Sequence, residues 1–494
     1  MQLTFQSTPL TFLRSALRQV QNQEQTLELR LTDGMPDLGR ILVTGGQTRL
    51  SSKQWRSGSV SITGGIQAWA IYAPEDGTLP QLVEGWIPFS GKWTLPEGSR
   101  EGILDARITL RSLDGRVLSP RKLLLRASVA LCAEALCPQE VSVCRPEEIP
   151  QDVCLLQNSY PVTLCREAGE KIFSLEETLE ADLPEKLIAC RVMPRLTEQS
   201  VAGDQLVLRG ALDIRCLGCD AEGNFRCSSM TQPFAQLVGL EGEYGKDATA
   251  SVTLDMGTWD WQREADGLSM RCEVLTQYRI QGNSLLNLAQ DAYSHTTDLL
   301  TQTEGLELPL LLEYRQETME AAGSLERNVS QVLDVSFLPD EPVTYREGEA
   351  MVAELPGQFQ VLYLDDSGVA QSLTESWCGR ISLPAGEECQ LQVYPCLEGE
   401  VAASVRNGTL HMQAPLRLQA RTYTKQCFPM VTGLELGQRK IQDPDRPSLI
   451  LRRAGDNSLW DMAKGYGSTV EAIRQANGLT GEPDPKQMLL IPVM

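Results

Sequence analysis

Histidine is nearly absent from this chain of 494 residues, which contains only His295 and His411. A Ser-His-Asp or Cys-His device needs a histidine beside a nucleophile and an orienting acid. His295 follows a Tyr-Ser pair in a connecting segment and His411 lies in an alternating strand, so neither position indicates catalysis. The sequence motifs for nucleotide phosphates, metalloprotease zinc and the serine-hydrolase nucleophile are also missing. We therefore expect no enzymatic activity and no cofactor.

Positive charge is scarce as well. The chain has 44 Lys and Arg against 65 Asp and Glu, a formal net charge of −21, which disfavours nucleic acid and anionic membranes as partners. No run of about 18 apolar residues is present, so we expect no membrane insertion. The first residues lack the basic region and apolar core of a secretory signal. We therefore expect a reducing compartment at synthesis, with the 14 cysteines made as thiols.

Three similar segments recur along the chain at a domain-sized period. Each is an alternating strand that enters an acidic turn ending in glycine, a pattern typical of β-hairpins. The turn glycines are Gly77, Gly223 and Gly368, so the spacings are 146 and 145 residues. Several short strands flank each turn, which predicts one β-sandwich or barrel-like unit per copy.

These patterns predict a mainly β chain of three tandem repeats followed by a small module. Acidic segments with scattered apolar residues, 170–183 and 298–321, predict partly helical connectors, and residues 10–20 predict a short amphipathic helix packed on the first domain. The predicted domains are a first β repeat with an N-terminal extension (1–155), a second repeat (156–297), a third repeat (298–432), a linker (433–447) and a terminal module (448–494).

The terminal module has the clearest pattern. An apolar strand at 449–451 runs into a Gly-Asp turn, and Asp456 or Ser458 can cap the helix that follows. Ser468 or Thr469 can open a second helix, and a closing strand lies at 489–491. The strand–helix–helix–strand order with these residues resembles the LysM module, a fold that binds and does not catalyse.

The full chain resembles the SPOCS-repeat spore coat morphogenetic proteins. Besides the terminal module, the resemblance rests on Gln290-Asp-Ala-Tyr-Ser294 after the second repeat and on the segment 171–180 before a repeat strand. It implies a scaffold or adaptor in the mother-cell cytoplasm, at the surface of the developing spore. It also implies that the LysM-like module binds a protein, a coat-basement ATPase of the stage IV sporulation protein A type, with other coat proteins or the chain itself as further partners.

The LysM resemblance also implies a shallow groove between two loops. The predicted groove residues are Gly455, Asp456, Asn457, Ser458, Leu459, Asn477, Gly478, Leu479 and Thr480. Such a groove binds peptidoglycan or N-acetylglucosamine polymers in many LysM modules, and this remains the alternative function. Asn457, where the family usually has Thr, and the missing secretion signal favour a protein partner. Trp460 is expected to be buried, and the pair Arg452-Arg453 can meet an acidic partner surface.

Cys216, Cys219 and Cys227 have the one spacing that resembles a metal site, with Cys190 or Cys272 as a fourth ligand. From the sequence, these cysteines could bind zinc, remain ordinary thiols or form a disulfide. Because the other repeats carry no cysteine at the equivalent positions, we predict no metal. The Asp365-Asp366-Ser-Gly368 segment lacks the later glutamate of a calcium loop and predicts a turn.

Overall fold

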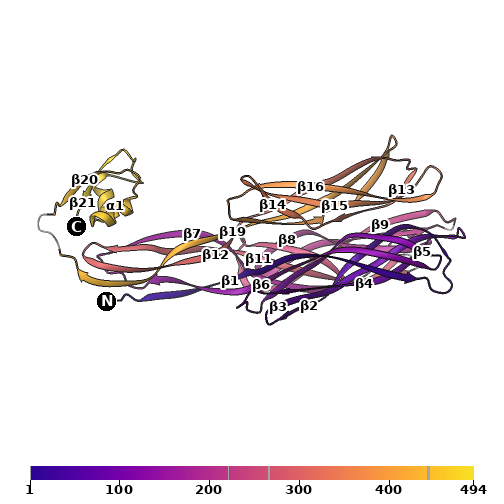
Figure 1. Cartoon of the computed structure of the whole chain (residues 1–494), viewed down its shortest axis with the longest axis horizontal. Helices are drawn as coiled ribbons and strands as arrows, with labels where there is room; N and C mark the ends of the chain where they lie inside the picture. The colour runs from indigo at the N-terminus through magenta and orange to yellow at the C-terminus, as the bar shows by residue number, and fades with distance from the viewer. Residues whose placement is uncertain (1, 221, 265–266, 442–445) are drawn as a thin grey trace.

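The computed structural model describes residues 2–220, 222–264, 267–441 and 446–494, and in these ranges the chain is built almost entirely of β-strands (Figure 1). The strands form three successive units, each with two antiparallel sheets, and a small module follows them. The prediction of a mainly β chain is confirmed. No sheet of the described residues closes on itself, so the barrel-like alternative is wrong.

Each unit pairs its first long strand with its last. The strand orders are β1-β6-β5 and β2-β3-β4 in the first unit, and β10-β11-β7 and β8-β9 in the second. In the third unit they are β12-β19-β17 and β13-β15-β14, with β18 also paired to β19 and β16 to β15.

The strands of each unit have the following bounds. The first unit comprises β1 (Phe5–Arg30), β2 (Leu38–Arg56), β3 (Ser59–Pro74), β4 (Gln81–Thr94), β5 (Ile103–Ser119) and β6 (Lys122–Pro146). The second comprises β7 (Val153–Glu180), β8 (Lys186–Cys219), β9 (Phe225–Tyr244), β10 (Thr249–Glu264) and β11 (Gly267–Ser294). The third comprises β12 (Thr297–Glu326), β13 (Gln331–Pro339), β14 (Val343–Glu347), β15 (Ala350–Leu364), β16 (Ala370–Pro384), β17 (Cys389–Leu397), β18 (Ala402–Arg406) and β19 (Thr409–Arg439).

The long strand pairs extend beyond the sheets as three two-stranded ribbons, which together we call the stalk. Its ribbons are 5–15 with 136–146, 153–165 with 281–294, and 297–311 with 423–439. Apolar side chains alternate along each ribbon and so gather on one face. The three faces meet in one core, formed by Phe12, Val143, Val162, Leu164, Leu286, Leu288, Leu306, Leu308, Leu310, Phe428 and Met430. The stalk forms the end of the molecule where the N-terminus lies in Figure 1.

A second shared core joins the three units beside their acidic turns. It takes Leu42 and Ile71 from the first unit, Ile188 and Leu217 from the second, and Leu333 and Leu362 from the third. The three turn glycines have the positive φ angles that their position requires, 73° at Gly77, 88° at Gly223 and 74° at Gly368. The predicted hairpin turns are therefore confirmed, and the three units meet in the apolar core beside them.

The acidic segment that could suggest a calcium loop is one of these turns. The Asp365 carboxylate accepts the backbone N–H groups of Ser367 (2.9 Å) and Val369 (3.0 Å). Hydrogen bonds from Ser367, Val369 and Gln371 lower the pKa of Asp365 to about 2. The carboxylate is therefore used within the turn, as the turn prediction requires.

The predicted helical connectors are wrong. Residues 170–180 lie in β7 and pair with β11, and residues 298–321 lie in β12 and pair with β19. The amphipathic helix expected over 10–20 lies in β1 and pairs with β6. In each case the partner strand supplies backbone hydrogen bonds along the whole segment, and this pairing overrides the helical preference of the acidic residues.

The terminal module has the order β20 (Leu449–Arg453), α1 (Leu459–Tyr466), α2 (Val470–Asn477) and β21 (Met488–Pro492). Ser458 caps α1 and Thr469 caps α2 through side-chain hydrogen bonds, and each helix ends at a glycine with φ 63°. The stretch predicted as a linker is partly strand, because β19 runs to Arg439, and its residues 442–445 lie outside the described residues. Neither α1 nor α2, the two helices of the described ranges, has the length or apolar character needed to span a membrane.

Candidate binding site in the terminal module

Hydrogen bonds join the loop after β20 to the loop after α2, among them that of the Ala454 N–H to the carbonyl oxygen of Gln487 (2.9 Å). Gly455, which has a left-handed conformation (φ 60°), donates its N–H to the carbonyl oxygen of Pro485 (2.9 Å). The N–H of Leu459 donates to a carboxylate oxygen of Glu482 at 3.3 Å. The structure therefore brings the loop after β20 against the loop after α2.

In the first loop, the side chains of two of the five predicted residues hold the module together. The Ser458 hydroxyl accepts the N–H of Asp461 (3.1 Å), and the Leu459 side chain is buried in the module core. The side chains of Asp456 and Asn457 are exposed. Ser458 is exposed as well, but its hydroxyl is used in the cap of α1, so Asp456 and Asn457 have the side chains of this loop that are most open to a ligand.

In the second loop, Asn477 ties the end of α2 to β21. Its side-chain amide donates to the carbonyl oxygens of Leu490 (2.7 Å) and Ile473 (2.8 Å), and its oxygen accepts the N–H of Leu490 (2.8 Å). Pairing backbone groups of α2 and β21 in this way is a stabilising role. Asn477 is therefore committed to the fold of the module.

The next three residues complete the helix end. Gly478 has φ 63° and donates its N–H to the carbonyl oxygen of Arg474, and the N–H of Leu479 donates to the same oxygen (3.0 Å). Leu479 is half-buried, whereas Thr480 is exposed. Of the second loop, Thr480 is the predicted residue whose side chain is open to a ligand.

Glu482 is a groove residue that sequence reasoning missed. Its carboxylate lies at the N-terminus of α1, where negative charge is favoured, and 4.0 Å from the guanidinium of Arg474. It accepts the Leu459 N–H, so this backbone donor is already paired within the module. No sequence spacing could have indicated this contact, because it joins the loop after α2 to the start of α1.

The module contacts the stalk through the Asp-Ala-Tyr-Ser element. The Asp291 carboxylate accepts the indole N–H of Trp460 (2.8 Å) and pairs with the ammonium of Lys464 (2.7 Å). The Tyr293 hydroxyl donates to the carbonyl oxygen of Ser468 (2.8 Å), and its ring meets the Trp460 ring edge-on at 4.8 Å. The last residues of strand β11 thus form a built interface for the module.

The prediction that Trp460 is buried changes in the light of that interface. Trp460 is half-buried, because its indole points toward the stalk and not only into the module core. Burial alone would raise the pKa of Asp291, but hydrogen bonds from Lys464 and Trp460 lower it below its usual range. Burial and a hydrogen bond with Cys154 raise the pKa of Tyr293. Asp291 is therefore a charged acceptor in the interface, and Tyr293 a neutral donor.

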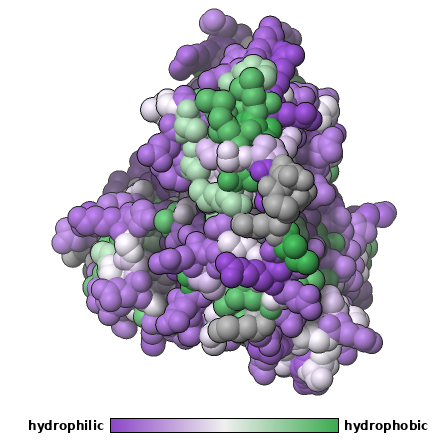
Figure 2. Space-filling view, turned by 90° about the vertical axis from the view of Figure 1, so that its left-hand side faces the viewer, coloured by the Kyte–Doolittle hydropathy of each residue, from purple (hydrophilic) through white to green (hydrophobic). Residues whose placement is uncertain are grey.

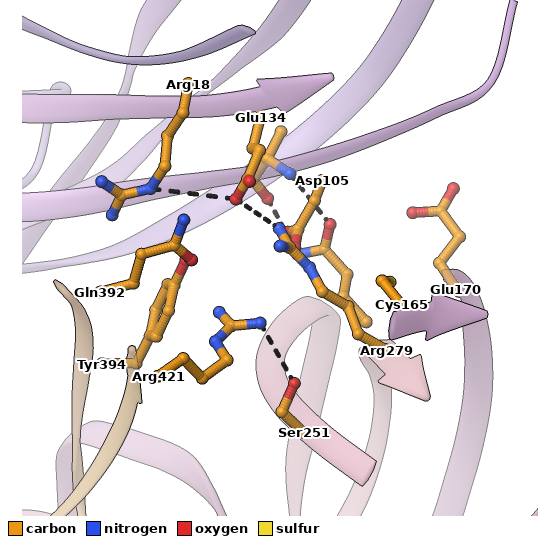
Figure 3. A network of polar contacts seen from close by, with 12 residues as sticks. Arg18, Asp105, Glu134, Cys165, Glu170, Ser251, Arg279, Gln392, Tyr394 and Arg421 are labelled. Carbon is orange, nitrogen blue, oxygen red and sulfur yellow. Dashed lines mark hydrogen bonds and ion pairs between the residues drawn. The ribbon is translucent and has the colours of Figure 1, made fainter. Parts of the chain in front are cut away.

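A network of buried charges lies where the three units meet (Figure 3). The Arg279 guanidinium, from the second unit, contacts the carboxylates of Glu134 (2.6 Å) and Asp105 (Nε–Oδ2, 2.9 Å), both from the first. The guanidinium of Arg421, from the third unit, donates to the hydroxyl of Ser251 (3.2 Å). Burial alone would raise the pKa of Glu134, but the charge of Arg279 lowers it to about 2.

The network residues occupy equivalent positions in the three units. Glu134, Arg279 and Arg421 lie on the last long strand of their units, β6, β11 and β19. In the strand register, each of these three residues lies opposite one residue of the first strand of its unit and one residue of the strand on its other side. These opposite residues are Arg18 and Asp105 in the first unit, Ala168 and Ser251 in the second, and Tyr314 and Gln392 in the third. The contacts join each unit to the next, so the network is an interface between units.

A cavity of about 620 Å³ opens between the same units. Its lining includes several arginines, but these are paired within the chain: Arg107 with Glu341 (2.6 Å), Arg195 with Asp213 (2.7 Å), Arg215 with Asp334 (3.2 Å) and Arg417 with Glu398 (2.6 Å). An anionic ligand would have to compete with these carboxylates. The charges of the cavity are therefore already paired, two pairs joining the third unit to the others (Arg107–Glu341 and Arg215–Asp334) and two lying within one unit (Arg195–Asp213 and Arg417–Glu398).

The cysteines of the predicted metal spacing do not share one face of their sheet. Cys216 faces Cys190, with their sulfur atoms 3.3 Å apart in the core of the second unit. Cys219 is three residues further along β8, and Cys227 pairs opposite Leu217, so both point to the other face. In the part of the chain that the structure describes, no cluster of three or more His, Cys, Asp or Glu suits a metal ion.

Comparison of the chain with models of known protein families, with curated proteins and with solved structures gave no match.

Proposed function

We propose that this chain is a non-enzymatic scaffold or adaptor of spore coat assembly, with three SPOCS-like β repeats and a C-terminal LysM module that binds a protein. The proposed partner is a coat-basement ATPase of the stage IV sporulation protein A type. The proposed location is the mother-cell cytoplasm at the surface of the developing spore.

The observation that carries this proposal is the interface between the module and the stalk. Asp291 and Tyr293 hold the module through contacts to Trp460, Lys464 and Ser468. A module that only needed to reach a distant glycan could be tethered by a flexible linker. A module held in a fixed orientation suits a scaffold, because it presents one surface to a partner in a defined direction.

The contacts within the groove favour a protein partner over a sugar polymer, because several polar groups of the groove are already paired within the module. The Leu459 N–H is paired with Glu482, Ser458 with Asp461, and Asn477 with β21. The exposed side chains of Asp456, Asn457 and Thr480 remain for a glycan, which is why peptidoglycan binding is kept as the alternative function.

The proposal is tested with the full-length chain as bait in two parallel samples. One is a lysate of sporulating cells of the source organism, and the other is purified peptidoglycan. Recovery of the coat ATPase without retention on peptidoglycan would support the adaptor. Retention on peptidoglycan that Thr480→Arg abolishes, while Thr318→Arg on the exposed face of β12 preserves it, would establish the glycan alternative.

A further inference from the structure

The two-stranded sheet of the module is apolar on both faces. Ile450, Leu489 and Ile491 point toward the helices and belong to the module core. The opposite face, which we call the outer sheet face, consists of Leu449, Leu451, Arg453, Met488 and Leu490, with Leu451 paired to Leu490 and Arg453 to Met488. Strands that are apolar on both faces are typical of sheets that are covered on both sides.

The outer sheet face is uncovered in this chain. Leu449 is 51% exposed, Leu451 60%, Met488 51% and Leu490 37%. The view onto the module end of the molecule shows a contiguous apolar patch there, surrounded by hydrophilic residues (Figure 2). An apolar patch with a polar rim on a folded protein marks an interaction site. The α1 side of the module is already occupied by Asp291 and Tyr293, so this face is the one directed away from the stalk.

The size of the outer sheet face fits a single helix. Five residues per strand at roughly 3.3 Å each give a length of about 16 Å, and two strands about 4.8 Å apart carry side chains over a width of about 10 Å. An α-helix of three turns has about the same length and diameter. One amphipathic helix could therefore cover the patch completely.

The charge around the patch indicates an acidic helix. Arg453 lies on the outer sheet face and is exposed, with its Nε donating to the carbonyl oxygen of Pro485 (3.3 Å). Arg452 is also exposed but pairs with Leu489, on the side of the sheet that faces the helices. Residues 446–494 contain six Lys or Arg and five Asp or Glu, a net charge of +1, whereas the remaining residues carry −22. A second copy of the chain would bring two strongly acidic bodies together, which their mutual repulsion disfavours.

We propose that the outer sheet face of the module is the protein-binding surface of this chain, and that it takes an amphipathic helix whose apolar stripe is flanked by Asp and Glu. This inference deepens the proposed function, since it names the surface through which the module would bind its partner. The groove between the two loops then has no part in that contact.

The test uses the full-length chain and a synthetic helical peptide, with Leu at positions i, i+3, i+4 and i+7 and Glu elsewhere. A second peptide has Lys in place of every Glu. Fluorescence anisotropy is expected to show at least tenfold weaker binding of the lysine peptide. Leu451→Asp and Arg453→Glu are each expected to weaken binding of the acidic peptide at least tenfold, and Leu300→Asp, at a 61% exposed leucine of β12, is expected to leave it unchanged.

The same variants separate this inference from the proposed function. If the coat ATPase binds the wild type, Leu451→Asp should abolish that binding as well. ATPase binding that survives both Leu451→Asp and Arg453→Glu would contradict the assignment of the outer sheet face as the binding surface, while leaving the proposed partner in place. Three other results would also contradict this assignment. They are equal binding of the acidic peptide to wild type and Leu451→Asp, no binding of that peptide at all, and self-association through Leu451. Circular dichroism of each variant checks that the chain remains folded.

Discussion

Replacing Asp291 by Ala should release the terminal module from the stalk without unfolding either part. Asp291 pairs with the Lys464 ammonium and accepts the Trp460 indole N–H. The side chains of Lys464 and Asp291 are 45% and 30% exposed, so solvent limits their ion pair to at most about 1 kcal/mol. The indole hydrogen bond adds about 1 kcal/mol. The expected loss of about 1–2 kcal/mol lowers the ratio of docked to undocked module by roughly 5–30-fold.

Hydrogen exchange measured by mass spectrometry reports this change directly. In Asp291→Ala, peptides from α1 and from the end of β11 should exchange faster, while those from the first unit should not change. Asp298→Ala removes an exposed carboxylate from the neighbouring strand β12 and serves as the matched control. Lys464→Ala should reproduce the effect, and the double variant should show less than the sum of the two single losses.

Unchanged exchange in α1 for Asp291→Ala would refute the reasoning. It would mean that the edge-on contact of Tyr293 with Trp460 and the hydrogen bond to Ser468 hold the module without the carboxylate. An increase in exchange throughout the first unit would contradict it as well, because it would show that Asp291 supports the body of the protein and not the interface.

Other predictions concern the buried network and the module. Glu134→Leu leaves the buried Arg279 with Asp105 alone and should cost about 3 kcal/mol in the free energy of unfolding, measured by urea titration. The pKa of Glu134 is lowered from 4.5 to about 2 in the folded chain. Its contribution to the free energy of unfolding is therefore complete above pH 4.5 and is lost as the pH falls toward 2. The stability difference between wild type and Glu134→Leu should therefore shrink over that range, and a difference that is constant with pH would contradict the assignment. Asn477→Ala removes three hydrogen bonds and should destabilise the module by about 1–3 kcal/mol, seen as faster exchange in α2 and β21.

Local features of this fold could be read from the sequence, because they depend on neighbouring residues. The turns at Gly77, Gly223 and Gly368 need a positive φ angle, and a glycine one or two residues after an acidic residue signals this directly. The caps at Ser458 and Thr469 follow from their hydroxyl groups in the same way.

Features that depend on distant pairing were missed. Segments 170–180 and 298–321 have acidic compositions that suit helices, and only their long partner strands make them extended. Glu134, Arg279 and Arg421 lie more than a hundred residues apart along the chain, and nothing in their local sequence indicates that they meet. The Asp-Ala-Tyr-Ser element was recognised in the sequence, but its contact with α1 depends on how the module lies against the stalk.

Binding of the full-length chain to two immobilised ligands, the purified coat ATPase and a chitin oligomer, tests the central claim most directly. The account predicts saturable binding to the ATPase, loss of that binding in Leu451→Asp, and no binding to the oligomer. Saturable binding to the oligomer, with no binding to the ATPase, would contradict the account and make the chain a glycan-binding protein.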